Sequence, residues 1–312
     1  MNNVSLLRDI IGNCILELGH INDKVVVINA DLSGTCRTKN FVSQFPRRSY
    51  NVGIAEQNLV SFAAGLAHEG YIPYAFTMAP FISMRACEQC RTDVAYANLS
   101  VRLIANYAGC SGGISGATHW AIEDCAIMQS IPNMVVMEPS DEIQARKMMT
   151  ATLSYSGPVY IRSSIVNVEK IYNDEYQFNI EEASYPKRGD DATIICSGVV
   201  VQYALKAVEL VEQINGYSIE IIDMHTIKPI DKRAIITAAK KGPILVAQDH
   251  NIIGGLAYSV ATVIAESGLS TKLKIVGIPD KFVPMAHADY LYNKFGYDTN
   301  GLVRAMLELM SR

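Results

Sequence analysis

An isolated acidic residue in an apolar stretch is the first candidate for chemistry. Glu56 lies in NVGIAEQNL (51–59) and is the only acid between Asp31 and Glu69. A carboxylate near a helix N-terminus gains about 0.3–1 kcal/mol from the helix dipole, which explains an acid at the start of the helical segment that follows. The dipole does not explain the apolar neighbours, among which a carboxyl group can stay protonated at neutral pH and donate a hydrogen bond. From the residues alone, a structural and a chemical role for Glu56 both stay open.

A glycine-rich loop is the second candidate. GCSGGISGATHW (109–120) stands between a predicted strand and a predicted helix, where α/β proteins often bind phosphates. The loop matches neither the dinucleotide-binding G-x-G-x-x-G nor a Walker sequence, and we do not interpret Ser111 in GCSGG as the nucleophile elbow of a serine hydrolase. The spacing is therefore as compatible with a close-packed turn as with a ligand cradle. Thr118 and His119 favour a site at the edge of the sheet, although His119 could also be a core histidine.

Composition limits the class of protein. The chain has 312 residues, 49% apolar and 19% charged, which is typical of a compact protein long enough for two domains. A net charge of −4 and the lack of a basic, aromatic-rich cluster argue against nucleic-acid binding. No apolar run could span a membrane, and the N-terminal segment is a poor signal peptide.

The seven cysteines follow no disulfide pattern, so we expect a reducing, cytoplasmic location. Cys87 and Cys90 form one C-x-x-C without a second pair, which favours two buried thiols over a zinc or redox site. Histidines, cysteines and acids are nowhere grouped at metal-ligand spacing, so we expect no metal site on this chain.

Short β-branched runs alternate with helical patterns along the chain. Predicted strands include VVVIN (25–29), YNVGI (50–54), YIPYAF (71–76), VRLIANY (101–107), MVVMEP (134–139) and PVYIRSS (158–164), and predicted helices cover 57–70, 80–98 and 141–154. A polar, tyrosine-rich segment interrupts this order, which then resumes from ATIICSG (192–198) to LKIVGI (273–278). The pattern predicts an α/β fold with two doubly wound, mostly parallel sheets. We expect a first domain at 1–166, a linker at 167–190 and a second domain at 191–312.

Eight blocks along the chain resemble the transketolase family. ADLSGT (30–35), NVGIAEQN (51–58), APFISMRACEQCRTDV (79–94), SGGISGATHWAIED (111–124), IPNMVVMEPSD (131–141) and GPVYIRSS (157–164) are similar to its pyrimidine-binding domain. IDMHTIKPID (222–231) and AQDHNIIGGLAYSVA (247–261) are similar to the C-terminal domain that follows it. The resemblance covers nearly the whole chain and implies the fold of a thiamine-diphosphate pyrimidine-binding domain followed by a transketolase C-terminal domain.

The resemblance implies a cofactor role for four residues. In this family a buried glutamate, matched by Glu56, donates a hydrogen bond to N1′ of the aminopyrimidine of thiamine diphosphate and so promotes loss of the proton from the thiazolium C2. Phe81 matches an aromatic residue that stacks on the pyrimidine ring, with Phe76 as a helper. Arg85 is a weaker match, because the alignment slips by one residue here.

The resemblance also implies a substrate site. His119 matches a histidine that faces the donor substrate and shuttles protons, and Arg162 matches an arginine that binds the phosphate of the sugar. Asp31 and Thr35 match residues of a loop that lines the substrate channel. Three positions that bear on the choice of sugar depart from the family pattern. They are Tyr107 in place of a histidine, Ser115 in place of an aspartate, and Trp120 in place of the glutamine after the histidine.

A missing motif predicts a partner. The chain has no Gly-Asp-Gly followed by Asn, the pattern that holds metal and diphosphate in the companion domain, and the GDD at 189–191 lies in the linker. Two phosphates need a divalent cation and a helix N-terminus to bind well. We therefore expect a separate N-terminal transketolase subunit that binds Mg²⁺ or Ca²⁺, with the cofactor across the interface. Self-association of this chain would complete a two-plus-two heterotetramer.

The activity implied is the reversible transfer of a two-carbon ketol group between sugar phosphates. A 1-deoxyxylulose-5-phosphate-synthase-like subunit, or the beta-like subunit of a 2-oxoacid dehydrogenase, would use the same cofactor and is the alternative. ADLSGT, NVGIAEQN and the histidine loop favour ketol transfer. A non-catalytic partner subunit is an alternative of another class, and the intact set of Glu56, Phe81 and His119 argues against it.

Overall fold

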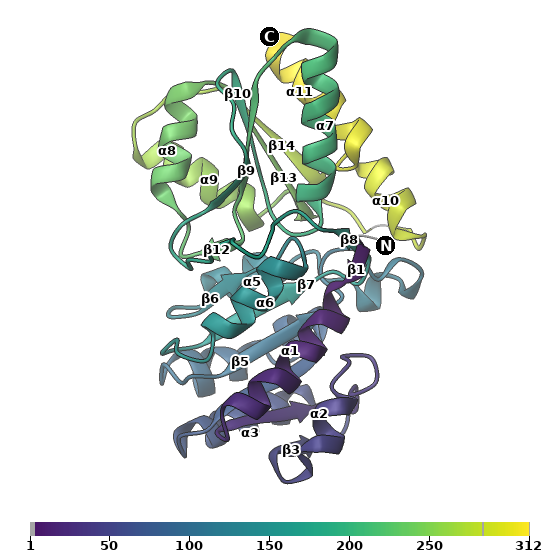
Figure 1. Cartoon of the computed structure of the whole chain (residues 1–312), viewed down its shortest axis with the longest axis vertical. Helices are drawn as coiled ribbons and strands as arrows, with labels where there is room; N and C mark the ends of the chain where they lie inside the picture. Colours follow the sequence, from purple (N-terminus) through teal and green to yellow (C-terminus); the bar gives the residue numbers. More distant parts are fainter. Residues whose placement is uncertain (1–3, 283, 312) are drawn as a thin grey trace.

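The structure is a computed structural model that describes residues 4–282 and 284–311. Two α/β halves, each built on its own sheet, are stacked along the long axis of the molecule (Figure 1). The first half contains, in order, β1 (Val4–Leu6), α1 (Leu7–Ile21), β2 (Val25–Asn29), α2 (Lys39–Gln44), η1 (Pro46–Arg48), β3 (Ser49–Asn51), α3 (Glu56–His68), β4 (Ile72–Met78), η2 (Phe81–Arg85), α4 (Cys87–Gln89), η3 (Cys90–Ala95), β5 (Arg102–Asn106), η4 (Gly113–Ser115), η5 (Ala117–His119), α5 (Asp124–Ser130), β6 (Val135–Met137), α6 (Glu142–Ala151), β7 (Val159–Ser163) and β8 (Asn167–Glu169). The second half contains β9 (Ser184–Lys187), β10 (Ala192–Cys196), α7 (Val200–Asn215), β11 (Ile219–Asp223), β12 (Thr226–Lys228), α8 (Lys232–Lys241), β13 (Ile244–Asn251), α9 (Gly255–Glu266), β14 (Leu273–Ile278), α10 (Ala288–Phe295) and α11 (Thr299–Ser311).

Both sheets are mostly parallel, which confirms the predicted fold class. The first has the strand order β12-β6-β7-β5-β4-β2-β3 and the second β14-β13-β10-β11-β9. Only the edge strands β12 and β9 run antiparallel to their neighbours within these two sheets of the described chain. Parallel strands joined by helices need both faces covered, and helices lie on both faces of each sheet (Figure 1).

Alternation along each buried strand divides the core into layers. On β2, Val25 and Val27 join the cluster that includes α1 and α6, whereas Val26 and Ile28 join the cluster that includes α3. This is the period of two that a strand covered on both sides requires. In the part of the chain that the structure describes, no helix combines the length and apolarity needed to cross a membrane.

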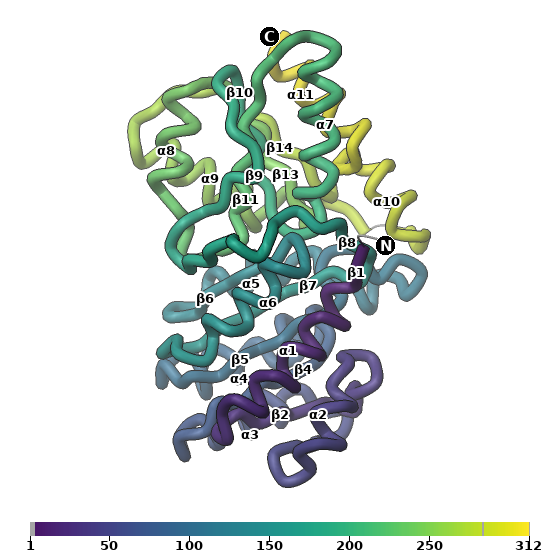
Figure 2. Tube along the Cα trace, viewed as in Figure 1, coloured from purple at the N-terminus to yellow at the C-terminus, as the bar shows by residue number. Residues whose placement is uncertain are grey.

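Three features differ from the sequence-based expectations. The single helix expected at 80–98 is two π-helical segments, η2 and η3, on either side of the short α4. The expected linker contains strands, since β8 pairs with β1 and β9 with β11. Strand β12 of the second half pairs with β6 and so completes the first sheet. Figure 2 shows the trace crossing between the two halves. The domain boundaries at 166 and 190 stay a prediction.

A buried arginine on β7 occupies the junction between the halves. Arg162 is 0% exposed. Its guanidinium donates to Asp124 at 2.8 and 3.1 Å and to Glu138 at 2.8 Å. A further hydrogen bond reaches the backbone oxygen of Asp249 in β13, at 3.1 Å. Two carboxylates of the first half therefore compensate the charge, as a buried ion requires, and the second half contributes a carbonyl acceptor.

A buried acid on β11 forms a second connection. Oδ2 of Asp223 accepts hydrogen bonds from Ser140 and Gln144 of the first half, at 2.8 and 2.9 Å, and from Tyr172 of the connecting segment at 2.8 Å. Burial raises the pKa of Asp223 to about 7, although these hydrogen bonds lower it. Asp223 is thus expected to bind a proton in the folded chain at a pH where the unfolded chain has lost it.

Replacing Arg162 tests the junction. We expect Arg162→Met to lower the free energy of unfolding by about 3–5 kcal/mol, because it leaves two buried carboxylates without their cation. Urea unfolding followed by circular dichroism measures the loss. Arg146→Met is the control: Arg146 pairs with Glu17 at the surface, so about 1 kcal/mol or less should be lost. Equal effects of the two substitutions would contradict the assignment.

The Asp223 carboxyl predicts a pH dependence. Its pKa is raised in the folded state, so its stabilising contribution is complete below pH 4 and is lost as the pH rises through about 7. Relative to Asp223→Asn, which cannot titrate, the wild-type chain should therefore lose stability between about pH 4 and pH 7. The change should be a few kcal/mol, because a tenfold change in proton affinity corresponds to about 1.4 kcal/mol. A stability difference that stays constant across this range in urea unfolding would disprove it.

Candidate active site

The candidate catalytic acid begins helix α3. Glu56 is 1% exposed, and Oε2 of its carboxylate accepts a hydrogen bond from Nη1 of Arg85 at 2.6 Å. The Arg85 side chain is 48% exposed, so this ion pair joins a buried carboxylate to the surface. Glu56 thus combines a buried position with a cationic partner that the sequence alone did not reveal.

Phe81 and His119 form a cluster with this ion pair. The ring centroids of Phe81 and His119 are 5.5 Å apart in an edge-to-face arrangement. The guanidinium carbon of Arg85 lies 4.5 Å from the centroid of the Phe81 ring, within the range of a cation–π contact. The structure therefore brings Glu56, Phe81, Arg85 and His119 together from α3, η2 and η5.

A pocket of about 740 Å³ opens beside this cluster. Burial and the charge of Asp124 raise the pKa of Glu123, one of its two charged residues. Phe282, contributed by the second half, is 86% exposed. A largely apolar pocket with a few polar groups is suited to a planar heteroaromatic ring. The residues that line it include Phe81, Met84, Arg85, Thr118, Trp120, Glu123 and Phe282.

A π-helical turn carries both Phe81 and Arg85. The turn follows Pro80, whose missing N–H is not needed at the start of a helix. Ser83 Oγ donates to the backbone oxygen of Ala79 at 2.7 Å. A π turn holds more residues than an α turn and is frequent at functional sites.

His119 lies on a loop whose ends are bonded to each other. Gly109 and Ala121 exchange two backbone hydrogen bonds of 2.9 and 3.0 Å. Gly109 and Gly113 have positive φ angles of 61° and 50°, which glycine adopts without strain. Oγ1 of Thr118 lies 2.8 Å from Nδ1 of His119, so Nε2 is the ring nitrogen that a ligand would meet.

A second pocket, of about 720 Å³, is lined by cationic side chains and by two predicted substrate residues. Its lining combines Thr35 and Tyr107 with three cationic side chains, Arg8, Arg37 and Lys39. Arg37 is paired with Asp9 at 2.5 Å, whereas the buried Nε of Arg8 has no hydrogen-bond partner. A buried donor without a partner costs free energy, and an anionic ligand would satisfy it.

These three cations are not among the site residues predicted from the sequence. Arg37 and Lys39 follow the ADLSGT block almost directly, and this was the available signal. The pocket also adjoins the histidine loop, because a Cβ built on Gly112 would lie 3.0 Å from Cδ1 of Tyr107 and 3.6 Å from the backbone oxygen of His119. Tyr107 therefore packs against the segment that carries the histidine.

Asp31 and Ser115 line neither of these two pockets. Asp31 is exposed and exchanges two 3.0 Å hydrogen bonds with the side chain of Asn51. Asn51 Oδ1 also accepts from the backbone of Gly53, just before Glu56. Ser115 is exposed at the end of η4. Their roles with substrate stay a prediction.

The structure contradicts the proposed roles of Arg162 and Phe76. Arg162 is completely buried, and its guanidinium is occupied by Asp124 and Glu138, so a sugar phosphate cannot reach it. Phe76 is 0% exposed and lies in the core beneath α1, because alternation along β4 turns it away from Ala75 on the opposite face. It cannot stack on a pyrimidine ring.

Three residues of metal-binding type meet near Arg162. Asp124, Cys125 and His250 each place one potential ligand atom within 4.8 Å of the others. Both carboxylate oxygens of Asp124 already accept hydrogen bonds, from Arg162 and Tyr160. Burial raises the pKa of the Cys125 thiol well above its ordinary value, which disfavours the thiolate that binds metals. We assign no metal to this group.

Comparison with known proteins agrees with this architecture. Residues 6–169 match the transketolase pyrimidine-binding domain, and residues 181–302 match the transketolase C-terminal domain. A protein of Methanocaldococcus jannaschii described as a transketolase C-terminal section is 41% identical over 303 residues, which cover 96% of this chain and 95% of the relative.

Two further relatives are similar over at least 95% of their length. The 6-deoxy-6-sulfo-D-fructose transketolase subunit SqwH of Clostridium sp. (strain MSTE9) is 36% identical over 307 residues, covering 98% of this chain and 95% of the relative. A solved structure described as a split gene transketolase, inactive beta4 tetramer, has a TM-score of 0.88 and 35% identity, and the match covers 98% of both chains. The chain therefore belongs to the transketolase family and contains its pyrimidine-binding and C-terminal domains.

Proposed function

We propose that this chain is the pyrimidine-binding subunit of a two-subunit, thiamine-diphosphate-dependent transketolase. It would transfer a two-carbon ketol group between sugars that carry an anionic end group. The observation that carries this proposal is the cluster of buried Glu56 with Phe81 and His119 beside a largely apolar pocket. When bound, thiamine diphosphate supplies the nucleophilic carbon that takes up and releases the two-carbon unit.

The acid would act on the pyrimidine ring. Arg85 occupies Oε2 of Glu56, so we assign the contact with the ring nitrogen to Oε1. Burial keeps water away from this carboxyl group, and a hydrogen bond made without competing water is stronger. Glu56 would hold the shared proton at the ring nitrogen, and Phe81 would offer its ring for stacking.

His119 would act on the substrate. Thr118 holds Nδ1, which orients the imidazole and leaves Nε2 to exchange a proton with a hydroxyl or carbonyl oxygen of the sugar. The edge-to-face contact with Phe81 restricts the ring further. A positioned histidine of this kind contributes about 10²–10⁴-fold in proton transfer.

The cationic pocket would bind the anionic end of the sugar. Arg8 has an unpaired buried Nε there, and Thr35 adds a hydroxyl group. Phosphate and sulfonate both present three oxygens to such donors. The similarity to a 6-deoxy-6-sulfo-D-fructose transketolase subunit supports an anionic sugar without deciding between the two groups.

A separate subunit would supply the diphosphate site. The chain lacks the Gly-Asp-Gly…Asn pattern. Four exposed apolar side chains line the first pocket or stand within three residues of its lining in the chain, and such groups often mark an interface: Met84, Ile114, Phe282 and Met285. The related split gene transketolase is described as an inactive beta4 tetramer, which supports the need for a second kind of subunit.

Reconstitution tests the proposal. The chain is co-expressed with a polypeptide that carries Gly-Asp-Gly…Asn, supplied with thiamine diphosphate and Mg²⁺, and assayed for ketol transfer from xylulose 5-phosphate. We expect activity for the pair and none for this chain alone. Loss of carbon dioxide from pyruvate without ketol transfer would favour the deoxyxylulose-phosphate-synthase-like alternative and overturn the proposal.

The substitution Glu56→Gln tests whether the carboxyl group has a chemical role apart from any role in folding. We expect kcat of the reconstituted enzyme to fall at least about 100-fold, because an amide cannot give up and take back the proton. Circular dichroism should be unchanged. Glu69→Gln, an exposed acid after the last turn of the same helix, should keep full activity. Near-normal turnover in Glu56→Gln would refute the role of this carboxyl group.

The cationic pocket predicts a defect in substrate affinity. Arg8→Met should raise KM for an anionic donor about 10–100-fold, which corresponds to the loss of a charged hydrogen bond, and should leave kcat within a few-fold of wild type. Arg47→Met, an exposed arginine of η1 outside this pocket, is the control. Comparing phosphorylated and sulfonated sugars identifies the preferred anion. An unchanged KM for both would exclude this pocket.

A further inference from the structure

The end of strand β13 contacts the base of the histidine loop. Oδ1 of Asp249 accepts a hydrogen bond from the backbone N–H of Cys110, at 3.0 Å. Two residues later the backbone N–H of Asn251 donates to the oxygen of Ile122, at 2.8 Å. Cys110 and Ile122 stand at the two ends of the loop that carries His119, so β13 joins both ends to the second half.

The contact of Asp249 with the loop is close and specific. A Cβ built on Gly109 would lie 2.1 Å from the Asp249 carboxyl carbon, so only glycine admits the carboxylate here. Asp249 is 2% exposed, and burial raises its pKa to about 6. The hydroxyl group of Tyr297, itself fully buried, donates to the same Oδ1 at 2.9 Å and fixes the carboxylate from behind.

A second segment of the same half packs on the tip of the loop. A Cβ on Gly113 would lie 3.1 Å from the backbone oxygen of Ala286, and one on Gly116 would lie 3.8 Å from Sδ of Met285. Trp120, next to His119, is 3% exposed and donates from Nε1 to the oxygen of Gly113 at 3.1 Å. Base and tip of the loop are therefore both supported by the second half.

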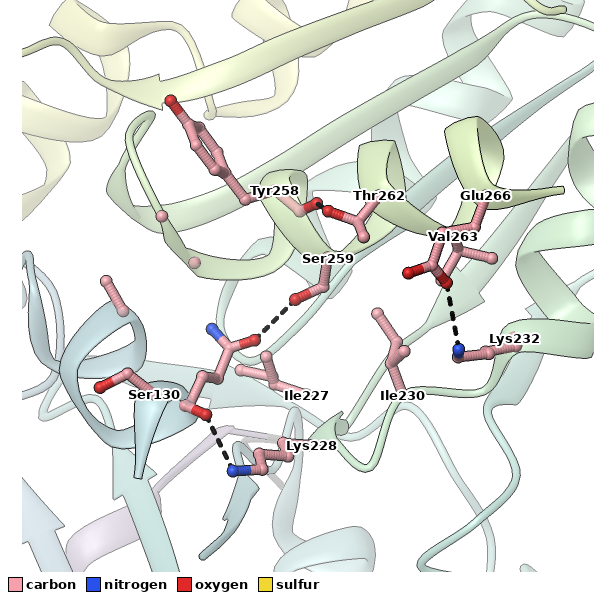
Figure 3. Close-up of a pocket in the computed structure, with 14 residues that line it drawn as sticks. Ser130, Ile227, Lys228, Ile230, Lys232, Tyr258, Ser259, Thr262, Val263 and Glu266 are labelled. Carbon is pink, nitrogen blue, oxygen red and sulfur yellow. Dashed lines mark hydrogen bonds and ion pairs between the residues drawn. The ribbon is translucent and has the colours of Figure 1, made fainter. Parts of the chain in front are cut away.

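Helix α5, which continues the loop, is held at both ends. At its start, His250 Nε2 lies 3.4 Å from the backbone nitrogen of Ala126. At its end, Ser259 donates to Oε1 of Gln129 at 2.7 Å, and Lys228 donates to the backbone oxygens of Gln129 and Ile131 at 2.8 and 2.5 Å. Figure 3 shows the hydrogen bonds that Ser259 of α9 and Lys228 of β12 make to Gln129, in a pocket of about 430 Å³.

We propose that Asp249 is a positioning residue through which the C-terminal domain holds the His119 loop in its active arrangement. The domain would then contribute to the reaction without touching substrate or cofactor. The significance for catalysis rests on the proposed function, whereas the hold on the loop does not. Asp223 is a matched contrast, since this equally buried acid of the same sheet bonds to Ser140, Gln144 and Tyr172 rather than to the loop.

The hold on the loop is tested on the purified chain. In Asp249→Ala we expect hydrogen exchange of the Cys110 amide and of the peptide covering 109–121 to speed up at least about 10-fold, with α3 and β4 unchanged. Fluorescence of Trp120, the single tryptophan, should become more sensitive to acrylamide. Asp249→Asn keeps an acceptor oxygen for Cys110 and should restore protection, which a general loss of packing would not allow.

The outcomes separate the two proposals. In the reconstituted enzyme, Asp249→Ala should lower kcat at least 10-fold with KM little changed, and Asp223→Asn should change neither the loop exchange nor kcat. Loop exchange equal to wild type in Asp249→Ala, or faster exchange spread evenly over both halves, would overturn the positioning role. Faster loop exchange in a protein that shows no ketol transfer with any partner would leave the hold on the loop intact and refute the proposed function.

Discussion

The charge of Arg162 is the constraint on which the rest of the structure depends. A guanidinium without access to water has to be matched by acceptors, and here they come from the start of α5, from Glu138 after β6 and from the backbone of β13. Burial alone would lower the pKa of Arg162, but the carboxylates of Asp124 and Glu138 outweigh it and raise the pKa well above the usual value. The side chain stays charged, and separating the two halves would take away the carbonyl oxygen of Asp249 that accepts one of its hydrogen bonds.

The polar contacts around Arg162 also connect the second half to the histidine loop. Arg162 donates to the oxygen of Ala121 at 3.3 Å, and Asp249 accepts from Cys110, so the polar junction surrounds the base of the histidine loop. Oxygen and nitrogen atoms in a dry interior have directional requirements that apolar contacts lack. Such directional contacts fix the position of the histidine loop and also stabilise the junction. This is the physical basis for the role we propose for Asp249.

The sequence predicts the regular parts of this architecture well. VVVIN (25–29) matches β2 residue for residue, and alternating strands and helices suffice to indicate two parallel sheets. The π turns at Phe81–Arg85 and Cys90–Ala95 could not be predicted, because apolar spacing hardly distinguishes an α turn from a wider one. Strands β8, β9 and β12 are too short and polar to show an alternating pattern in the sequence. Their partner strands also lie far away in the chain, so no local pattern indicates the pairing.

Site residues were predictable where the local pattern also determines burial. Glu56 is the clearest example, since its apolar neighbours are the ones that bury it. Arg162 is the opposite case, because the family motif predicts a role for it but not its burial. Whether this arginine faces a pocket or the core depends on Glu138 and Asp124, which lie 24 and 38 residues away in the chain. Phe76 shares the parity of Tyr74, but β4 is buried on both faces, so alternation alone does not tell which face carries the site.

The arginine–carboxylate pairs formed by Arg162 and by Arg85 differ in a way that suits their positions in the fold. Arg162 is fully enclosed and bonded to several partners, so its arrangement cannot change without a large cost. Arg85 is half exposed and binds one oxygen of Glu56, so water can solvate the guanidinium if it moves. A buried carboxylate needs a partner at all times, because leaving it unpaired costs several kcal/mol. Arg85 meets that need in the free chain, and under the proposed function a ring nitrogen joins it or replaces it. The junction therefore requires a rigid pair, whereas the pocket requires one that can be exchanged.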